Sequence, residues 1–284
     1  VRGLINIQFA YVSENLFVIE ANPRASRTVP FVSKATGVQL AKAAVMIGLG
    51  KSIAELKAEG YLPKNMDGAS LPQNTAIAVK AAVLPFSRFR TPEGVVVDSL
   101  LSPEMRSTGE VMGLDTLYDT AFAKAQAGAG SPLPTEGKVF VSVANHDKRN
   151  VIIYAKMLEQ LGFEIVSTGG TADVLRRNGV NSTVASKFAE ANGQHSIVDM
   201  VRNGEIDLIL NTPAGGAARS DGYEIRAAAV SVGCPVMTTI SEFAAAVQAI
   251  TALRERSWEI INLQEHGEFL RTASTGEQGQ DKGE

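Results

Sequence analysis

The chain has 284 residues, 45% of them apolar, a formal net charge of −3 and one cysteine, Cys234. This length suggests about two domains of ~150 residues, with enough apolar content for packed cores. The charge gives no general attraction to nucleic acid or anionic membranes. One cysteine excludes an internal disulfide, and no apolar run reaches the ~20 residues that span a bilayer. We therefore expect a cytoplasmic globular protein.

The first predicted element is a β-hairpin over residues 5–22, because two apolar runs flank a turn-forming Ser-Glu-Asn cluster. Side chains alternate between the two faces of a strand, so Gln8 lies opposite its apolar neighbours. Glu20 and Asn22 are two apart and point the same way in an extended chain, which Pro23 favours. The hairpin can therefore bring an amide, a carboxylate and a second amide together.

Two interpretations of this hairpin stay open on spacing alone. Oxygen ligands suit magnesium or manganese, and the adjacent Arg24 could hold a phosphate or balance charge on a transferred phosphoryl group. The alternative is an ordinary hairpin whose polar face meets water, with Glu20 and Arg24 as a weak surface ion pair.

The chain up to residue 137 reads as a mixture of helices, strands and loops. A glycine-bounded apolar pattern predicts a helix over 38–47, with Pro30 in the connection before it. We further expect a loop over 61–75, a strand over 77–84, a helix that pairs Arg106 with Glu110, and an Ala-rich helix over 117–126. The Gly-, Pro- and Ser-rich segment 127–137 predicts a linker between domains.

Beyond the linker, strands alternate regularly with helices, which predicts a parallel sheet covered on both faces. The expected strands are 138–143, 164–167, 180–185, 207–211 and 235–239. The expected helices are 147–161, 171–178, 196–203, 223–230 and 242–252. Ligands of such sheets bind outside the carboxyl ends of the strands.

Polar residues gather at those strand ends, and Lys148 begins the first helix. They are Ser142, Thr168 to Thr171, Lys187, Asn211, Thr212, Thr238 and Thr239. Hydroxyls, glycines and lysines at one edge make a phosphate site, since helix N-termini offer free N–H groups. For any one of these residues a cap or turn role is the better explanation. Five such strand ends together favour an anion site.

Several long words resemble the large subunit of carbamoyl-phosphate synthetase, over residues 1 to about 270. They are NIQFA, VIEANPRASRTVPFVSKATGVQLAKAA, LPFSRF and SPEMRSTGEVMG, followed by SVANHDKRN, STGGTADVLRRNG and LILNTPAGG. The resemblance implies a C-terminal fragment with α/β architecture. Residues 1–130 would be the end of an ATP-grasp α+β unit, and 138–271 a parallel-sheet, Rossmann-like, methylglyoxal-synthase-like allosteric domain. Residues 272–284 are polar and predict a disordered tail.

For the first part, the resemblance implies ATP-dependent phosphorylation of carbamate to carbamoyl phosphate, for pyrimidine and arginine biosynthesis. Gln8, Glu20 and Asn22 would hold Mg²⁺ or Mn²⁺, Gln8 and Glu20 would also contact ATP, and Arg24 would be catalytic. A glutaminase small subunit and an oligomer are the implied partners. The chain lacks the family's glycine-rich loop and lysines over ATP, so we expect no synthesis by it alone. The alternative is a stand-alone nucleotide-binding regulatory module without catalysis.

For the second part, the resemblance implies a site for UMP formed by Ser142, Lys148, Thr168, Thr171, Lys187 and Asn211, with Thr238 in an activator site. Two departures leave the effectors open. Ala81 replaces a glutamate that binds ornithine in enteric-type enzymes, and Pro213 replaces a threonine.

Catalysis of the methylglyoxal synthase type is not expected from this domain. Ala217 follows the glycine pair where that enzyme needs an aspartate base, and Asp221 lies farther on. His146 and His195 are isolated and predict no zinc site. We expect His146 to face solvent or to act as a cap.

Overall fold

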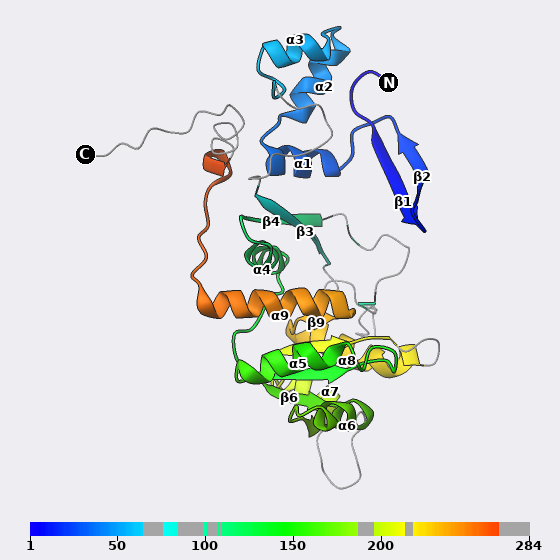
Figure 1. Ribbon diagram of the computed structural model, residues 1–284, viewed down its shortest axis with the longest axis vertical. Helices are drawn as coiled ribbons and strands as arrows, with labels where there is room; N and C mark the ends of the chain where they lie inside the picture. The colour runs from blue at the N-terminus through cyan, green and yellow to red at the C-terminus, as the bar shows by residue number, and fades with distance from the viewer. Residues whose placement is uncertain are drawn as a thin grey trace, which may run out of the picture. The chain divides into compact units, whose positions relative to one another are not determined.

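A computed structural model describes residues 1–64, 76–84, 99–100, 107, 109–186, 196–213 and 218–266, with backbone only over 218–221. The chain divides into two compact units, Val1–Ile77 with Glu259–Glu284, and Ala78–Trp258 (Figure 1). The predicted disordered tail and Lys187 lie outside the described residues. The predicted domain ranges 1–130 and 138–271 stay predictions.

The first unit begins with the predicted hairpin, formed by β1 (Asn6–Val12) and β2 (Asn15–Asn22). Its strands are antiparallel, and the two turn residues Ser13 and Glu14 have φ of 49° and 64°. Two positive φ values match the right-handed twist of the strands that the turn joins. The register shifts after Gln8, so Ile19 is an extra residue opposite the Gln8–Phe9 step.

Three short helices follow, α1 (Thr28–Thr36), α2 (Leu40–Gly48) and α3 (Ile53–Ala58). The predicted connection around Pro30 is wrong, because this stretch is α1. Pro30 lies in the first helical turn, where a missing N–H breaks no intrahelical bond. Sequence analysis also missed α3, although Ser52 and Glu55 form the capping box that begins it.

The second unit starts with a two-stranded sheet of β3 (Ile77–Val83) and β4 (Gly109–Asp115), followed by α4 (Tyr118–Gly128). The predicted pairing of Arg106 with Glu110 on a helix is wrong, because Glu110 lies in strand β4. There its carboxylate pairs with Lys80 at 3.6 Å. Gly113 of β4 lies against the backbone of α4, where a Cβ atom would overlap Ala121. Only glycine allows this approach.

The predicted parallel sheet is confirmed, with strand order β7-β6-β5-β8-β9. Its strands are β5 (Lys138–Ser142), β6 (Glu164–Ser167), β7 (Thr183–Val184), β8 (Leu208–Asn211) and β9 (Val236–Met237). Its helices are α5 (Val151–Gln160), α6 (Gly169–Arg177), α7 (Ile197–Arg202), α8 (Ala218–Val232) and α9 (Ile240–Glu255).

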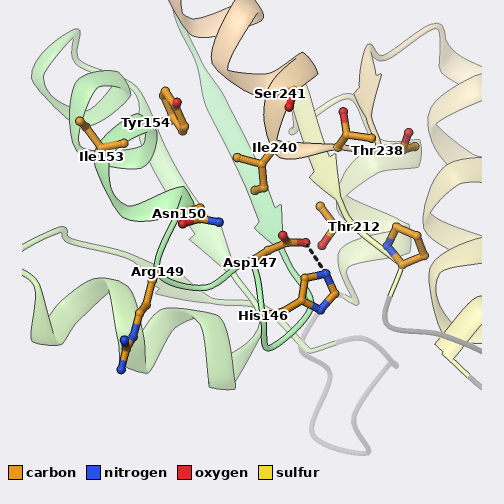
Figure 2. A pocket seen from close by; sticks show the side chains of 12 residues that line it. His146, Asp147, Arg149, Asn150, Ile153, Tyr154, Thr212, Thr238, Ile240 and Ser241 are labelled. Carbon is orange, nitrogen blue, oxygen red and sulfur yellow. Dashed lines mark ion pairs between the residues drawn. The ribbon is translucent and has the colours of Figure 1, made fainter. Parts of the chain in front are cut away.

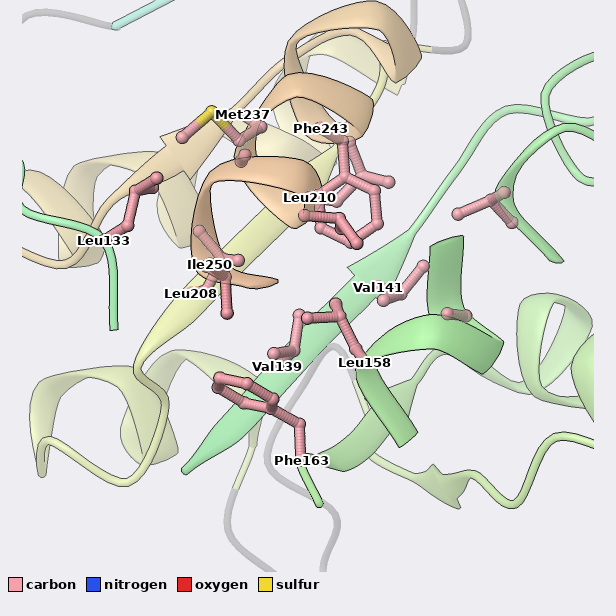
Figure 3. Close-up of a cluster of buried hydrophobic side chains, with 14 of the residues drawn as sticks. Leu133, Val139, Val141, Leu158, Phe163, Leu208, Leu210, Met237, Phe243 and Ile250 are labelled. Carbon is pink, nitrogen blue, oxygen red and sulfur yellow. The ribbon is translucent and has the colours of Figure 1, made fainter. Parts of the chain in front are cut away.

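Side chains of β5 and β8 alternate between two cores, one on each face of the sheet. Val139, Val141, Leu208 and Leu210 pack with residues of α5 and α9 (Figure 3). Phe140 and Ile209 pack with residues of α7 and α8. Helix α4 packs on α9 and contributes Phe122 to the first core. The alternation determines which face each strand-end residue points to.

Burial makes the thiol of the single cysteine, Cys234, less reactive. Burial, with a smaller effect of Asp207, raises the pKa of the Cys234 thiol to about 12, and its Sγ lies 3.4 Å from the Ile206 carbonyl oxygen. Only the thiolate reacts with alkylating agents. At pH 8, folded chain should therefore be alkylated by iodoacetamide about 10³-fold more slowly than chain unfolded in guanidinium. Equal alkylation rates in the two states would contradict the raised pKa of Cys234.

Candidate functional site

In the first unit, the predicted oxygen ligands lie on one face of the hairpin. Gln8 and Glu20 are directly opposite across the strands, and Asn22 Nδ2 donates to Glu20 Oε1 at 2.9 Å. Because Asn22 uses its nitrogen in this bond, its Oδ1 is the atom left to meet a cation. The structure thus brings together the three side chains named from the sequence.

Arg24 follows the hairpin, and its guanidinium donates to the carbonyl of Ala25 at 3.2 Å. In the part of the chain that the structure describes, no ion pair links it to Glu20. Three or more His, Cys, Asp or Glu side chains do not cluster as a metal site anywhere among these residues. A cation at Glu20 would therefore have one carboxylate ligand and take others from amides, water or phosphate, as Mg²⁺ commonly does.

The rest of the hairpin surface is apolar and exposed. Ile7 pairs with Ala21, Phe9 with Val18 and Tyr11 with Leu16, so these residues share one face. Their large side chains are between 39% exposed at Ile7 and 71% at Tyr11. An isolated two-stranded hairpin is marginally stable in water, and an apolar patch of this kind is typical of a surface that packs on other protein.

In the second unit, three hydroxyls meet at the carboxyl edge of the sheet, two from strand ends and one from the first turn of α6. Ser142 Oγ lies 3.4 Å from Thr168 Oγ1, which lies 3.4 Å from Thr171 Oγ1. Ser142 is also the register partner of Asn211 on β8. The alternation of the strands places both on the face covered by α7 and α8.

The N-terminus of α6 points the same way as this group. Thr168 occupies the N-cap position, but its side chain makes no cap hydrogen bond, so its hydroxyl is turned toward Ser142. The first N–H groups of a helix have no intrahelical partner and carry a partial positive charge. Lys148 adds a full charge, because its Nζ lies 3.1 Å from the position of a Cβ on Gly170. Hydroxyls, N–H groups and an ammonium group together suit an anion.

Arg226 is a residue of this site that sequence analysis missed. It lies in α8, is 0% exposed, and donates from Nη1 to Asn211 Oδ1 at 2.9 Å. The only signal in the sequence is an arginine between Ile225 and three alanines, a pattern that equally fits a surface position on a helix.

A separate cavity of ≈ 780 Å³ opens where β8 and β9 end and α9 begins (Figure 2). Its lining includes His146, Asp147, Pro213, Thr238 and Thr239, but none of the predicted UMP residues that the structure describes. His146 is exposed, as expected, and its Nε2 lies 3.4 Å from Asp147. Thr238 lines this cavity, whereas Ser142, Thr168 and Asn211 are not among its lining residues.

Comparison with known proteins finds a family match within each unit. The family described as "MGS-like domain" matches residues 150–238, and "Carbamoyl-phosphate synthase L chain, ATP binding domain" matches residues 1–56. The carbamoyl phosphate synthase large chain of Kocuria rhizophila is 65% identical over 283 residues, which cover 99% of this chain and 26% of that protein. The chain is related to the carbamoyl phosphate synthase large chains.

Other relatives agree with this assignment. The large chain from Paenarthrobacter aurescens is 66% identical over 277 residues, covering 96% of this chain and 25% of its own length. The large chain from Streptomyces coelicolor is 57% identical over 276 residues, with the same coverage. The chain thus spans about a quarter of the length of the curated relatives it matches. The resemblance and fold class predicted from the sequence are confirmed.

The two family matches contain most of the predicted site residues, but Ser142 and Lys148 lie outside both. The ATP-binding match contains Gln8, Glu20, Asn22 and Arg24, and the MGS-like match contains Thr168, Thr171, Asn211 and Thr238. No helix within the described ranges is long and apolar enough to cross a bilayer.

The folding stability of this unit should depend on pH through Glu242, at the start of α9. Burial raises the pKa of this carboxyl, although its Oε2 accepts a hydrogen bond from the Thr238 N–H at 3.2 Å. The folded state therefore binds a proton more tightly than the unfolded state, and this contribution to stability falls as pH rises from the unfolded pKa through the folded one.

The variant Glu242→Gln should remove that dependence, because its Oε1 still accepts from Thr238 but does not titrate. Urea unfolding between about pH 4 and pH 8 measures the slope. Glu255→Gln, an exposed carboxylate on the same helix, is the matched control. An unchanged slope in Glu242→Gln would show that this carboxyl does not contribute.

Proposed function

We propose that this chain forms part of a cytoplasmic carbamoyl phosphate synthase that phosphorylates carbamate with ATP, for pyrimidine and arginine biosynthesis. Its first unit would supply a metal and nucleotide site, and its second would bind a nucleoside monophosphate, UMP, as regulator. The proposal extends to a glutaminase small subunit as partner and to an oligomer. The observation that carries it is the group formed by Gln8, Glu20 and Asn22 on a segment matched by the ATP-binding family.

In the first unit, Glu20, the amide oxygen of Asn22 and Gln8 would hold Mg²⁺ or Mn²⁺ against nucleotide phosphates. Such an ion neutralises charge on the phosphates during phosphoryl transfer. Gln8 and Glu20 fix the ligand face because they are opposite residues of one hairpin. Arg24 would turn from the Ala25 carbonyl to the transferred group, where its fork of donors suits a phosphoryl oxygen pair.

In the second unit, a phosphate group would lie at the N-terminus of α6, between Thr168, Thr171 and Lys148. Ser142 and Asn211 would contact the ligand from the strand ends, and Lys187 would add a further charge. Thr238, which lines the cavity at the start of α9, would serve a separate effector. The presence of Ala81 in place of the family's glutamate argues against ornithine as that effector.

The alternative is a regulatory nucleotide-binding module without catalysis. One observation favours it for this chain taken alone. The donors of the phosphate site come from one compact unit, whereas the hairpin offers one carboxylate and an exposed apolar face. Binding of UMP without ATP turnover would fit this alternative, so the two sites need separate tests.

The regulatory site predicts that the chain binds UMP. Calorimetry with the whole chain should detect binding at or below millimolar UMP. Lys148→Met should weaken it about 10- to 100-fold, because a charge-assisted bond to phosphate contributes roughly 1.5–3 kcal/mol. Lys156→Met, an exposed lysine on α5, is the matched control. Absence of heat with the unaltered chain would refute the site.

The metal site predicts that Glu20 is essential to the synthase. In a large chain that contains this sequence, Glu20→Gln should lower carbamate-dependent ADP formation at least about 10²-fold, because the metal loses its only carboxylate from the hairpin. Glu14→Gln, in the turn of the same hairpin, should leave the rate unchanged. Normal activity of Glu20→Gln would exclude the metal role.

A further inference from the structure

The buried contact between Arg226 and Asn211 determines which atom Asn211 offers to a ligand. Asn211 is 6% exposed and ends β8 beside Ser142, while Arg226 reaches it from α8 with no exposed surface of its own. Both side chains are buried, so this is not an ordinary surface contact.

An asparagine amide has two nearly isosteric orientations, one with oxygen and one with nitrogen toward a given neighbour. Arginine has five donors and no acceptor. Asn211 must therefore turn Oδ1 toward Arg226, as the 2.9 Å distance to Nη1 reflects. Its Nδ2 then points away from the guanidinium. Within the described ranges, Asn211 Nδ2 donates to no other residue. The outward-facing atom of Asn211 is thus a donor.

Gly222, one turn before Arg226 on α8, provides the space for this contact. A Cβ atom at position 222 would lie 2.6 Å from Asn211 Oδ1 and would overlap Arg226 Nη1. Its φ is not in the left-handed region, so its backbone does not require glycine. Glycine at position 222 is therefore explained by the room that the Arg226–Asn211 contact needs.

We propose that Arg226 is a positioning residue, which holds the Asn211 amide with its oxygen inward and its N–H group toward the anion site. The site then meets an oxyanion with a donor from β8 in addition to the Thr168 and Thr171 hydroxyls. With the amide reversed, Oδ1 would face the anion and repel it. This inference rests on the proposed nucleotide site. The orientation of the Asn211 amide would explain why that site selects a phosphate group.

Affinity for UMP tests this arrangement, measured by calorimetry on the whole chain. Asn211→Ala, Arg226→Met and Gly222→Ala should each weaken binding about tenfold, the loss of one hydrogen bond to a charged group. Gly222→Ala keeps the arginine charge and favours the helix, so its loss of affinity would separate amide orientation from simple charge. Arg177→Met, an exposed arginine on α6, should bind as the unaltered chain does.

The double variant Arg226→Met with Asn211→Ala should bind no more weakly than Asn211→Ala alone, because Arg226 acts through Asn211. A purely structural role for Arg226 would not produce this coupling. The side-chain ¹⁵N signal of Asn211 should also shift when UMP is added to the unaltered chain, and not in Gly222→Ala.

Two results would overturn the inference and leave the nucleotide site intact. They are normal UMP affinity in Gly222→Ala and Arg226→Met, or additive losses in the double variant. If Arg226→Met does not fold, Gly222→Ala and Asn211→Ala still decide the question. Failure of the unaltered chain to bind UMP would instead refute the nucleotide site and, with it, this inference.

Discussion

The parallel pairing of β5 with β6 and β8 is the constraint on which the second unit depends. Register places Ser142 opposite Asn211, and the connection after β6 brings Thr168 to the same edge. Strand alternation then sends these side chains to one face while Val139 and Val141 pack on the other. A shift of one residue would exchange core and site, so the hydrophobic core itself fixes where the polar atoms lie.

Two groups of polar residues lie at the carboxyl edge of this sheet. The hydroxyls of Ser142, Thr168 and Thr171, the Lys148 ammonium and the N-terminus of α6 form one group, whereas Thr238 lines a cavity at the start of α9. Two neighbouring residues at the end of β8 contact different parts of the unit. Asn211 bonds Arg226 on one side, and the hydroxyl of the next residue, Thr212, accepts from the Ala144 N–H at 2.8 Å.

The hairpin of the first unit has a different character. Its polar face carries Gln8, Glu20 and Asn22 because these residues are register partners or two apart on one strand, and its other face exposes large apolar side chains. The extra residue Ile19 lies next to this polar face, where a bulge can re-aim side chains. The relatives are about four times longer than this chain, and an exposed apolar ribbon is consistent with a role inside a larger ATP-binding domain.

The sequence by itself determined the hairpin, the alternating parallel α/β unit and the clustering of Ser142, Thr168, Thr171 and Asn211, since period-two patterns and strand ends are local signals. It misjudged α1, because a proline suggests a loop unless it lies in the first turn. Only the tertiary structure decided that Thr238 lines a cavity with His146 and Asp147 and that Arg226 reaches Asn211. Those facts depend on which face of the sheet each helix covers, and no local pattern around Arg226 records it.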